Sequence, residues 1–174
     1  MITTAASVRP ARLDELAELR SIEQAAGVLF REIGMVDVAE HAPPAVEVFE
    51  RYQRAGRAWV LAGLDDRPIG FVLVKLVDGA AHIEQVSIHP DHGRQGLGQL
   101  LIDHVAQWAA GQALPAVTLS TFRSVPWNGP YYARLGFREL TTAEITPGLA
   151  EILAEETAFG LDPAERVFMR RESV

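Results

Sequence analysis

Hydrophobic and polar positions along the chain repeat with two periods, and these periods predict its elements. Apolar residues spaced three and four apart predict helices at about residues 14–30, 44–55, 96–110, 130–135 and 147–157. Apolar and β-branched runs predict strands at residues 8–10, 58–64, 69–77, 82–89, 117–121, 137–140 and 166–170. Asp78-Gly79, between two of these strands, predicts a tight hairpin. The order of elements predicts an α/β fold with a mixed, mostly antiparallel central sheet flanked by helices.

The boundaries and the domain count follow from the same pattern. Asp14 is expected to cap the first helix, and residues 31–44, which contain Gly34, Pro43 and Pro44, are expected to be irregular. Residues 141–165 read as a helical insert between the last two strands. The chain has 174 residues and no linker or repeat, so residues 1–174 are predicted to form a single domain.

Composition narrows the functional classes. Apolar residues make up 48% of the chain and charged residues 22%, a normal globular balance. The formal net charge of −7 opposes nonspecific binding of nucleic acid and mildly favours cationic partners such as amines. The sequence contains no cysteine, which excludes disulfides, zinc–thiolate sites and a cysteine nucleophile. We find no apolar run of membrane-spanning length and no export signal in residues 1–10, so a cytoplasmic protein without membrane contact is expected.

The segment from residue 88 to residue 98 carries the most chemical information. It reads Ile-His-Pro-Asp-His-Gly-Arg-Gln-Gly-Leu-Gly, between a predicted strand and a predicted helix. Glycines allow backbone N–H groups to point inward, and a helix start adds unpaired N–H groups and partial positive charge. We therefore expect the amides between Pro90 and Leu97 to bind a phosphate or pyrophosphate, with Arg94 adding a full charge.

Two common nucleotide loops do not fit this segment. A Walker loop needs Lys and then Ser or Thr after its glycine, whereas Gln99 follows Gly98. A dinucleotide fingerprint would need a small residue where Leu101 stands and an acidic residue after the next strand. A tight turn without a ligand is the remaining alternative from these glycines alone.

The wider context resembles the GNAT superfamily of N-acetyltransferases. The strand ending Val86-Ser87-Ile88-His89-Pro90, followed by the three glycines and a helix, is similar to the acetyl-CoA motif of that family. The segment Asn128-Gly129-Pro130-Tyr131-Tyr132-Ala133-Arg134-Leu135-Gly136-Phe137 resembles its second motif. The opening Val8-Arg9-Pro10-Ala11 also resembles the usual start of such domains.

This resemblance implies a cofactor site and a reaction. Acetyl-CoA is the implied co-substrate, and an amine attacks its thioester directly. The implied cofactor-binding residues are Val86, Ser87, Ile88, Gly93, Arg94, Gln95, Gly96, Leu97, Gly98, Asn128 and Tyr131. Backbone N–H groups near residues 86–88 are expected to stabilise the oxyanion by analogy.

Two side chains are candidates for proton transfer. Glu84, on the strand before the loop, is the candidate base for the attacking amine. Tyr132 matches the family position of the general acid that protonates the leaving thiolate. Each has a structural alternative: Glu84 as an ion-paired strand residue, and Tyr132 as a core aromatic.

The acceptor and the exact class of function stay open. Phe122, Arg123 and Trp127, or residues 29–44, are candidate walls of an acceptor pocket, and packing explains both sets equally well. We expect no metal site, because strand alternation places His82 and His89 on opposite faces; His104 is expected on a helix surface. A non-catalytic acyl-CoA-binding sensor is the main alternative to an enzyme, and the sequence leaves a homodimer open.

Overall fold

The computed structural model describes residues 6–173, in which seven strands form one sheet in the order β1-β2-β3-β4-β5-β7-β6. The strands are β1 Ser7–Pro10, β2 Ala58–Ala62, β3 Pro68–Val77, β4 Ala80–Ile88, β5 Ala116–Phe122, β6 Arg138–Glu139 and β7 Arg166–Glu172. The helices are α1 Leu16–Gly27, α2 Val36–Glu40, α3 Val46–Arg54, α4 Leu97–Gly111, α5 Gly129–Arg134 and α6 Pro147–Ala158. β4 pairs with β5 in parallel, while β1–β2, β2–β3, β5–β7 and β6–β7 are antiparallel. This confirms the predicted mixed, mostly antiparallel sheet with flanking helices.

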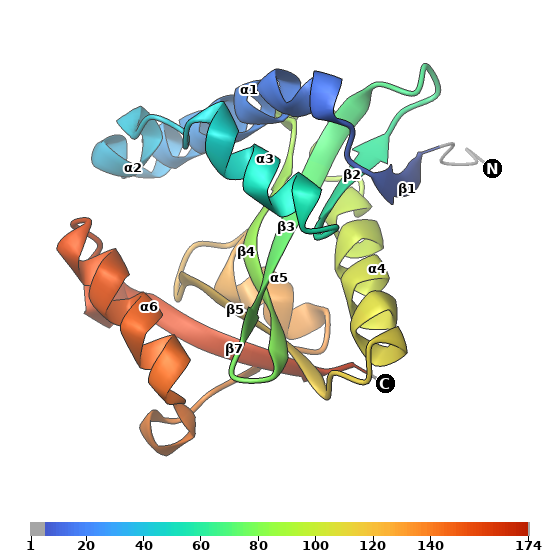
Figure 1. The fold of residues 1–174 in the computed structure, drawn as a ribbon. Helices are drawn as coiled ribbons and strands as arrows, with labels where there is room; N and C mark the ends of the chain where they lie inside the picture. Colours follow the sequence, from blue (N-terminus) through green and yellow to red (C-terminus); the bar gives the residue numbers. More distant parts are fainter. Residues whose placement is uncertain (1–5, 174) are drawn as a thin grey trace. The chain divides into compact units, whose positions relative to one another are not determined.

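The described residues form two compact units, one from residues 6–74 and 85–104 and the other from residues 75–84 and 105–173. In the first unit, α1 and α3 lie side by side over β2 and β3 (Figure 1). Leu19 of α1 and Phe49 of α3 are fully buried there, and Phe49 meets Phe71 edge to face at 5.6 Å. Burial of these apolar side chains is the main source of stability in this unit.

The start of the first helix differs from the prediction. Asp14 is not its cap: a short 3-10 turn, Leu13–Glu15, comes first, with Arg12 at its N-cap, and α1 begins at Leu16. The Glu15 carboxylate accepts hydrogen bonds from the Arg12 backbone N–H at 2.7 Å and from the Arg9 guanidinium at 2.8 and 2.9 Å. The bond from the N-cap residue Arg12 and the bonds from Arg9 of β1 fix the start of the helix on Glu15, and the capping preference of Asp14 does not decide it.

The following segment is also more regular than predicted. α1 ends at Gly27 and a 3-10 segment, Val28–Ile33, continues the chain. The short helix α2 occupies part of residues 31–44, which were expected to be irregular. Gly34 ends the 3-10 segment in a left-handed conformation at φ 80°, so the turn predicted from this glycine is present while the segments around it are helical.

In the second unit, α6 packs its apolar face on the sheet. Leu149 and Ile152 of α6 contact Phe168 of β7 in one buried cluster, together with Val77 at the end of β3. The Asp78-Gly79 turn joins β3 to β4 with φ values of 49° and 78°, as a type I′ hairpin requires. The predicted hairpin is confirmed.

Asp78 also holds the first turn of α6, which gives a stability prediction. Its Oδ2 accepts a hydrogen bond at 2.8 Å from the backbone N–H of Gly148. We expect Asp78→Ala to lower the free energy of unfolding by about 1–2 kcal/mol, because it removes the cap and places alanine at positive φ. Asp78→Asn keeps an acceptor oxygen and tolerates positive φ, so it should cost under about 1 kcal/mol in urea denaturation. Equal losses in the two variants would contradict this role.

None of the helices within residues 6–173 is both long and apolar enough to cross a membrane. The expectation about an export signal falls partly on residues 1–5, which lie outside the described residues. The single-domain prediction stays a prediction.

Candidate active site

The end of β4 is fixed where the glycine loop begins. The backbone N–H of His89 donates a hydrogen bond to the Ile69 carbonyl of β3 at 2.8 Å. Ser87 is buried, and its hydroxyl accepts a hydrogen bond from the Gln85 side chain at 2.9 Å. Val86 and Ile88 on either side of Ser87 are half-buried. The three predicted strand residues therefore sit on a rigid support immediately before the loop.

The first part of the loop uses its own amides internally. Residues Pro90–His92 form a 3-10 turn in which the Asp91 N–H donates to Nδ1 of His89 at 3.1 Å. The His92 N–H donates to the His89 carbonyl at 2.9 Å, and the Gly93 N–H donates to the Pro90 carbonyl at 3.0 Å. The expectation that all amides from Pro90 onward bind an anion is therefore wrong for these three residues. The Gly93 N–H serves the turn.

The second part of the loop leaves its amides available. Arg94 and Gly96 both adopt left-handed backbone, with φ of 61° and 70°. Across residues 6–173 we find no protein acceptor for the N–H groups of Arg94, Gln95 and Gly96. α4 then begins at Leu97, and the first N–H groups of a helix, here including Gly98, have no intrahelical partner. Left-handed residues that expose successive N–H groups before a helix start form a backbone nest for an anion.

The surroundings of Gly96 are open. A Cβ atom added there would meet no heavy atom within 4 Å. Arg94 and Gln95 are exposed beside it, while Leu97 is buried and anchors the helix start. Further along α4, His104 is half-buried and meets Trp59 edge to face at 5.3 Å, and burial lowers its pKa. His104 therefore packs one side of its ring on Trp59 and remains partly exposed on α4.

In the second unit, Tyr132 is held rigidly by α5. Its ring is buried and meets the rings of Tyr131 at 5.4 Å and Phe137 at 5.9 Å, both edge to face. Burial raises the pKa of the Tyr132 phenol, and the neighbouring Tyr131 raises it further. The phenol is therefore protonated at neutral pH, and its raised pKa makes it a weaker acid than an exposed tyrosine.

The start of α5 is fitted closely against the end of β5. A Cβ atom on Gly129 would lie 2.7 Å from the Arg123 carbonyl oxygen, so only glycine allows this approach. The Asn128 carbonyl accepts the Tyr132 N–H at 3.0 Å, while its side chain makes no capping bond. Tyr131 is half-buried under the guanidinium of Arg134. Asn128 and Tyr131 thus help to orient α5.

Glu84 is ion-paired. Its Oε2 lies 2.9 Å from Nζ of Lys75 on β3, and its side chain is 40% exposed. Glu84 lines a cavity of about 290 Å³ that also contains residues of α6. The ion pair matches the structural alternative for Glu84, and its place in a cavity keeps the carboxylate accessible to a ligand.

The sequence interpretation did not recognise the role of His82. This side chain, 2% exposed, lines the same cavity, and its Nδ1 lies 2.8 Å from the Thr118 hydroxyl. Burial, together with the nearby charge of Lys75, lowers its pKa to about 3. Residues two apart on a strand lie on the same face, so the sequence alone could have placed His82 beside Glu84 on β4.

The other predicted walls have different partners. The guanidinium of Arg123 forms an ion pair with Glu139, and the ring of Phe122 is buried beneath the Arg166 guanidinium at 4.5 Å. Among residues 29–44, Arg31 pairs with Glu40 on the surface. No group of three or more potential metal ligands occurs in the described part of the chain.

The buried His82 gives a pH prediction. Folding lowers its pKa from 6.5 to about 3, so the unfolded chain binds the proton first as the pH falls. Its contribution to stability is complete above the unfolded pKa and is lost as the pH falls from there toward the folded value. The free energy of unfolding should then decrease by up to about 1.4 kcal/mol per pH unit in this window. In urea titrations from about pH 7 to about pH 5, His82→Asn should show a shallower decrease than the wild type; parallel curves would contradict a neutral buried His82.

These features define a class of protein. The sheet order, the exposed amides before α4 and the buried tyrosine of α5 are those of an acyl-CoA acyltransferase fold. The sequence model of the Acetyltransferase (GNAT) family matches residues 20–137, so the chain belongs to this family and is an acyltransferase.

Solved structures have the same fold. A GNAT-family acetyltransferase from Staphylococcus aureus superposes with a TM-score of 0.73 at 16% identity, covering 98% of this chain and 100% of that one. The N-acetylglutamate synthase of Neisseria gonorrhoeae, complexed with coenzyme A and N-acetyl-glutamate, gives a TM-score of 0.72 at 16% identity, covering 97% of this chain and 35% of that one. The PaiA N-acetyltransferase of Thermoplasma acidophilum, in complex with coenzyme A, gives 0.66 at 15% identity, covering 96% and 98%.

Proposed function

We propose that this protein transfers the acetyl group of acetyl-CoA directly to a primary amine. The observation that carries the proposal is the group of N–H donors at residues 94–96, for which we find no protein acceptor across residues 6–173, directly before the first turn of α4. A diphosphate fits such a donor set because it offers several anionic oxygens to converging amides. The N-acetylglutamate synthase and the PaiA N-acetyltransferase, two structures of similar fold that are complexed with coenzyme A, support this choice of ligand.

Separate groups between residues 86 and 97 bind the diphosphate and the oxyanion in the proposed complex. The amides of Gln95, Gly96 and Leu97 bind the diphosphate, and the Arg94 side chain adds positive charge. In the implied arrangement, backbone N–H groups of residues 86–88 stabilise the oxyanion that forms when the amine attacks the thioester carbon. Gly93 acts through the turn that presents these groups.

Two side chains move protons in the proposed reaction. Glu84 accepts the proton that the amine must lose, directly or through a water molecule, so that the nitrogen lone pair can attack the carbonyl carbon. The carbon–sulfur bond breaks when the tetrahedral intermediate collapses, and Tyr132 donates its phenolic proton to the departing thiolate. Lys75 holds the Glu84 carboxylate in one position through the ion pair at 2.9 Å.

The test is a thiol-release assay with acetyl-CoA and a panel of primary amines, combined with mass spectrometry of the products. We expect release of one coenzyme A per acetylated amine, and calorimetric binding of coenzyme A to the protein without amine. Coenzyme A binding without turnover on any amine would instead identify a non-catalytic acyl-CoA sensor. No coenzyme A binding would reject the proposed site at residues 94–98.

A further inference from the structure

The insert between β6 and β7 builds one wall of a cavity. α6 covers the sheet through Leu149 and Ile152, and beyond Ile152 its second half lies over the cavity of about 290 Å³. Residues of β3, β4, β5 and β7 also line this space. The volume lies at the lower end of the range for small-molecule pockets, which favours a small ligand over a polypeptide segment.

One side chain that lines this cavity has an open ring nitrogen. His82 uses Nδ1 for the Thr118 hydroxyl, and we find no further hydrogen bond of its ring among the described residues. A neutral imidazole has one donor and one acceptor nitrogen, so Nε2 can bind a polar ligand group. The Nε2 atom is not among the enclosed side-chain atoms that lack a partner, so water or a polar ligand group in the cavity can reach it.

The cavity is lined by more anionic than cationic side chains. Two cationic and three anionic side chains line it. Arg166 and Glu156 form a bidentate, largely buried ion pair at 3.0 and 3.1 Å, to which Ser120 adds a hydrogen bond. Lys75 pairs with Glu84. The remaining carboxylate, Glu155, has no cationic partner within the described part of the chain.

We propose that this cavity is the acceptor site and that it selects a small amine carrying a second positive charge. The proposal rests on the proposed acetyl transfer, in which Glu84 accepts the proton of the reacting amine. Glu155 supplies the negative charge that favours the second ammonium group, and Nε2 of His82 binds a polar group of the acceptor. The Arg166–Glu156 pair is already saturated, so it attaches α6 to β7 and leaves the ligand to the other groups.

Three matched probes test the charge preference: putrescine, n-butylamine and γ-aminobutyrate, which are amines of four carbons that differ at the end away from the shared amino group. We expect kcat/KM to be highest for putrescine and lowest for γ-aminobutyrate. Glu155→Gln should reduce the advantage of putrescine over n-butylamine by about fivefold, the upper range for a partly exposed charge pair. This effect should shrink as ionic strength rises.

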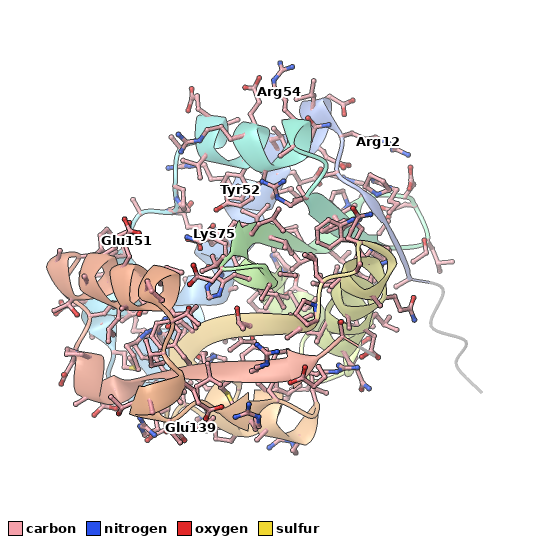
Figure 2. All side chains as sticks on the ribbon, turned by 60° about the horizontal axis from the view of Figure 1, so that its bottom comes forward. Arg12, Tyr52, Arg54, Lys75, Glu139 and Glu151 are labelled. Carbon is pink, nitrogen blue, oxygen red and sulfur yellow. The ribbon has the colours of Figure 1, made fainter. Side chains whose placement is uncertain are left out.

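The matched control is Glu151→Gln on the same helix, an exposed glutamate outside the cavity (Glu151 and Lys75 are labelled in Figure 2). It should leave the ratio of the two amines unchanged. Putrescine binding to the protein without acetyl-CoA, followed by calorimetry and by the ring resonances of His82, provides a readout that does not depend on turnover. Both signals should respond to putrescine, and Glu155→Gln should weaken the binding.

Several results would overturn the proposal while leaving acetyl transfer intact. One is equal kcat/KM for putrescine and n-butylamine, and another is the same response of Glu155→Gln and Glu151→Gln. A peptide N-terminus acetylated with higher kcat/KM than putrescine would reject a small-molecule site. If coenzyme A does not bind at all, the proposed function fails first, and the calorimetric titration with putrescine alone still tests the cavity.

Discussion

Replacing Gly96 with aspartate is expected to weaken coenzyme A binding by at least about tenfold more than replacing it with asparagine. Both side chains tolerate the left-handed backbone at φ 70°, and both fit the open space around this position. The two variants have nearly the same size, so their difference isolates a negative charge placed beside the amides of residues 94–98. An anion bound there is repelled by aspartate and not by asparagine.

Isothermal titration calorimetry with coenzyme A measures this difference directly. The difference in coenzyme A affinity between the two variants should decrease in high salt. Salt screens the repulsion between the aspartate and the diphosphate, which both lie near the surface. Pantetheine, which lacks the diphosphate, is the control ligand. The aspartate and asparagine variants should bind it with equal affinity. Equal coenzyme A affinities of the aspartate and asparagine variants would show that the diphosphate is bound elsewhere.

Local sequence signals predicted the elements that depend on local physics. Asp78-Gly79 gave the hairpin because both of its residues accept positive φ. The glycine spacing indicated an anion loop because backbone conformation, at Gly96 in particular, decides where the amides point. The same spacing did not distinguish amides used by the 3-10 turn at Pro90–His92 from those left available after Gly93.

Features that depend on distant partners were missed. Asp14 has a good capping side chain, but the first turn closes on Glu15, which accepts bonds from Arg9 and Arg12. These two arginines are held in turn by the distant Asp66. No sequence pattern predicted the ion pair between Glu156 of the insert and Arg166, because that contact depends on how α6 packs against the sheet. Glu156 and Arg166 both line the cavity of about 290 Å³, which the sequence interpretation did not predict.

The ion pair between Lys75 and Glu84 could have been predicted in part, because a local turn sets the register of the two strands that carry it. A two-residue hairpin turn fixes the register of its strands, which would place Lys75 opposite His82 and diagonal to Glu84. The alternation of β4 then puts His82 and Glu84 on one face. The sequence alone could therefore have placed Lys75, His82 and Glu84 together. The burial of His82, which keeps its imidazole neutral, could be seen only in the structure.

Tyr132→Phe is expected to lower kcat by about 100-fold with little change in coenzyme A affinity. Phenylalanine keeps the edge-to-face contacts with Tyr131 and Phe137, so the substitution removes the hydroxyl and leaves the packing of α5 in place. The loss falls on the step in which the thiolate leaves, because a basic leaving group needs a proton and the buried phenol holds one at neutral pH. Tyr52→Phe on α3 removes a phenol from the first unit and should change kcat less than about threefold.

An acyl donor with a weakly basic leaving group distinguishes proton donation from a structural effect. With p-nitrophenyl acetate the departing anion is stable without a proton, so the deficit of Tyr132→Phe should shrink to within about threefold of the wild type. A general acid acts only where the leaving group needs protonation, whereas a displaced helix impairs both donors alike. An equal deficit with acetyl-CoA and p-nitrophenyl acetate would therefore assign Tyr132 to the framework of α5 and require another proton donor for the thiolate.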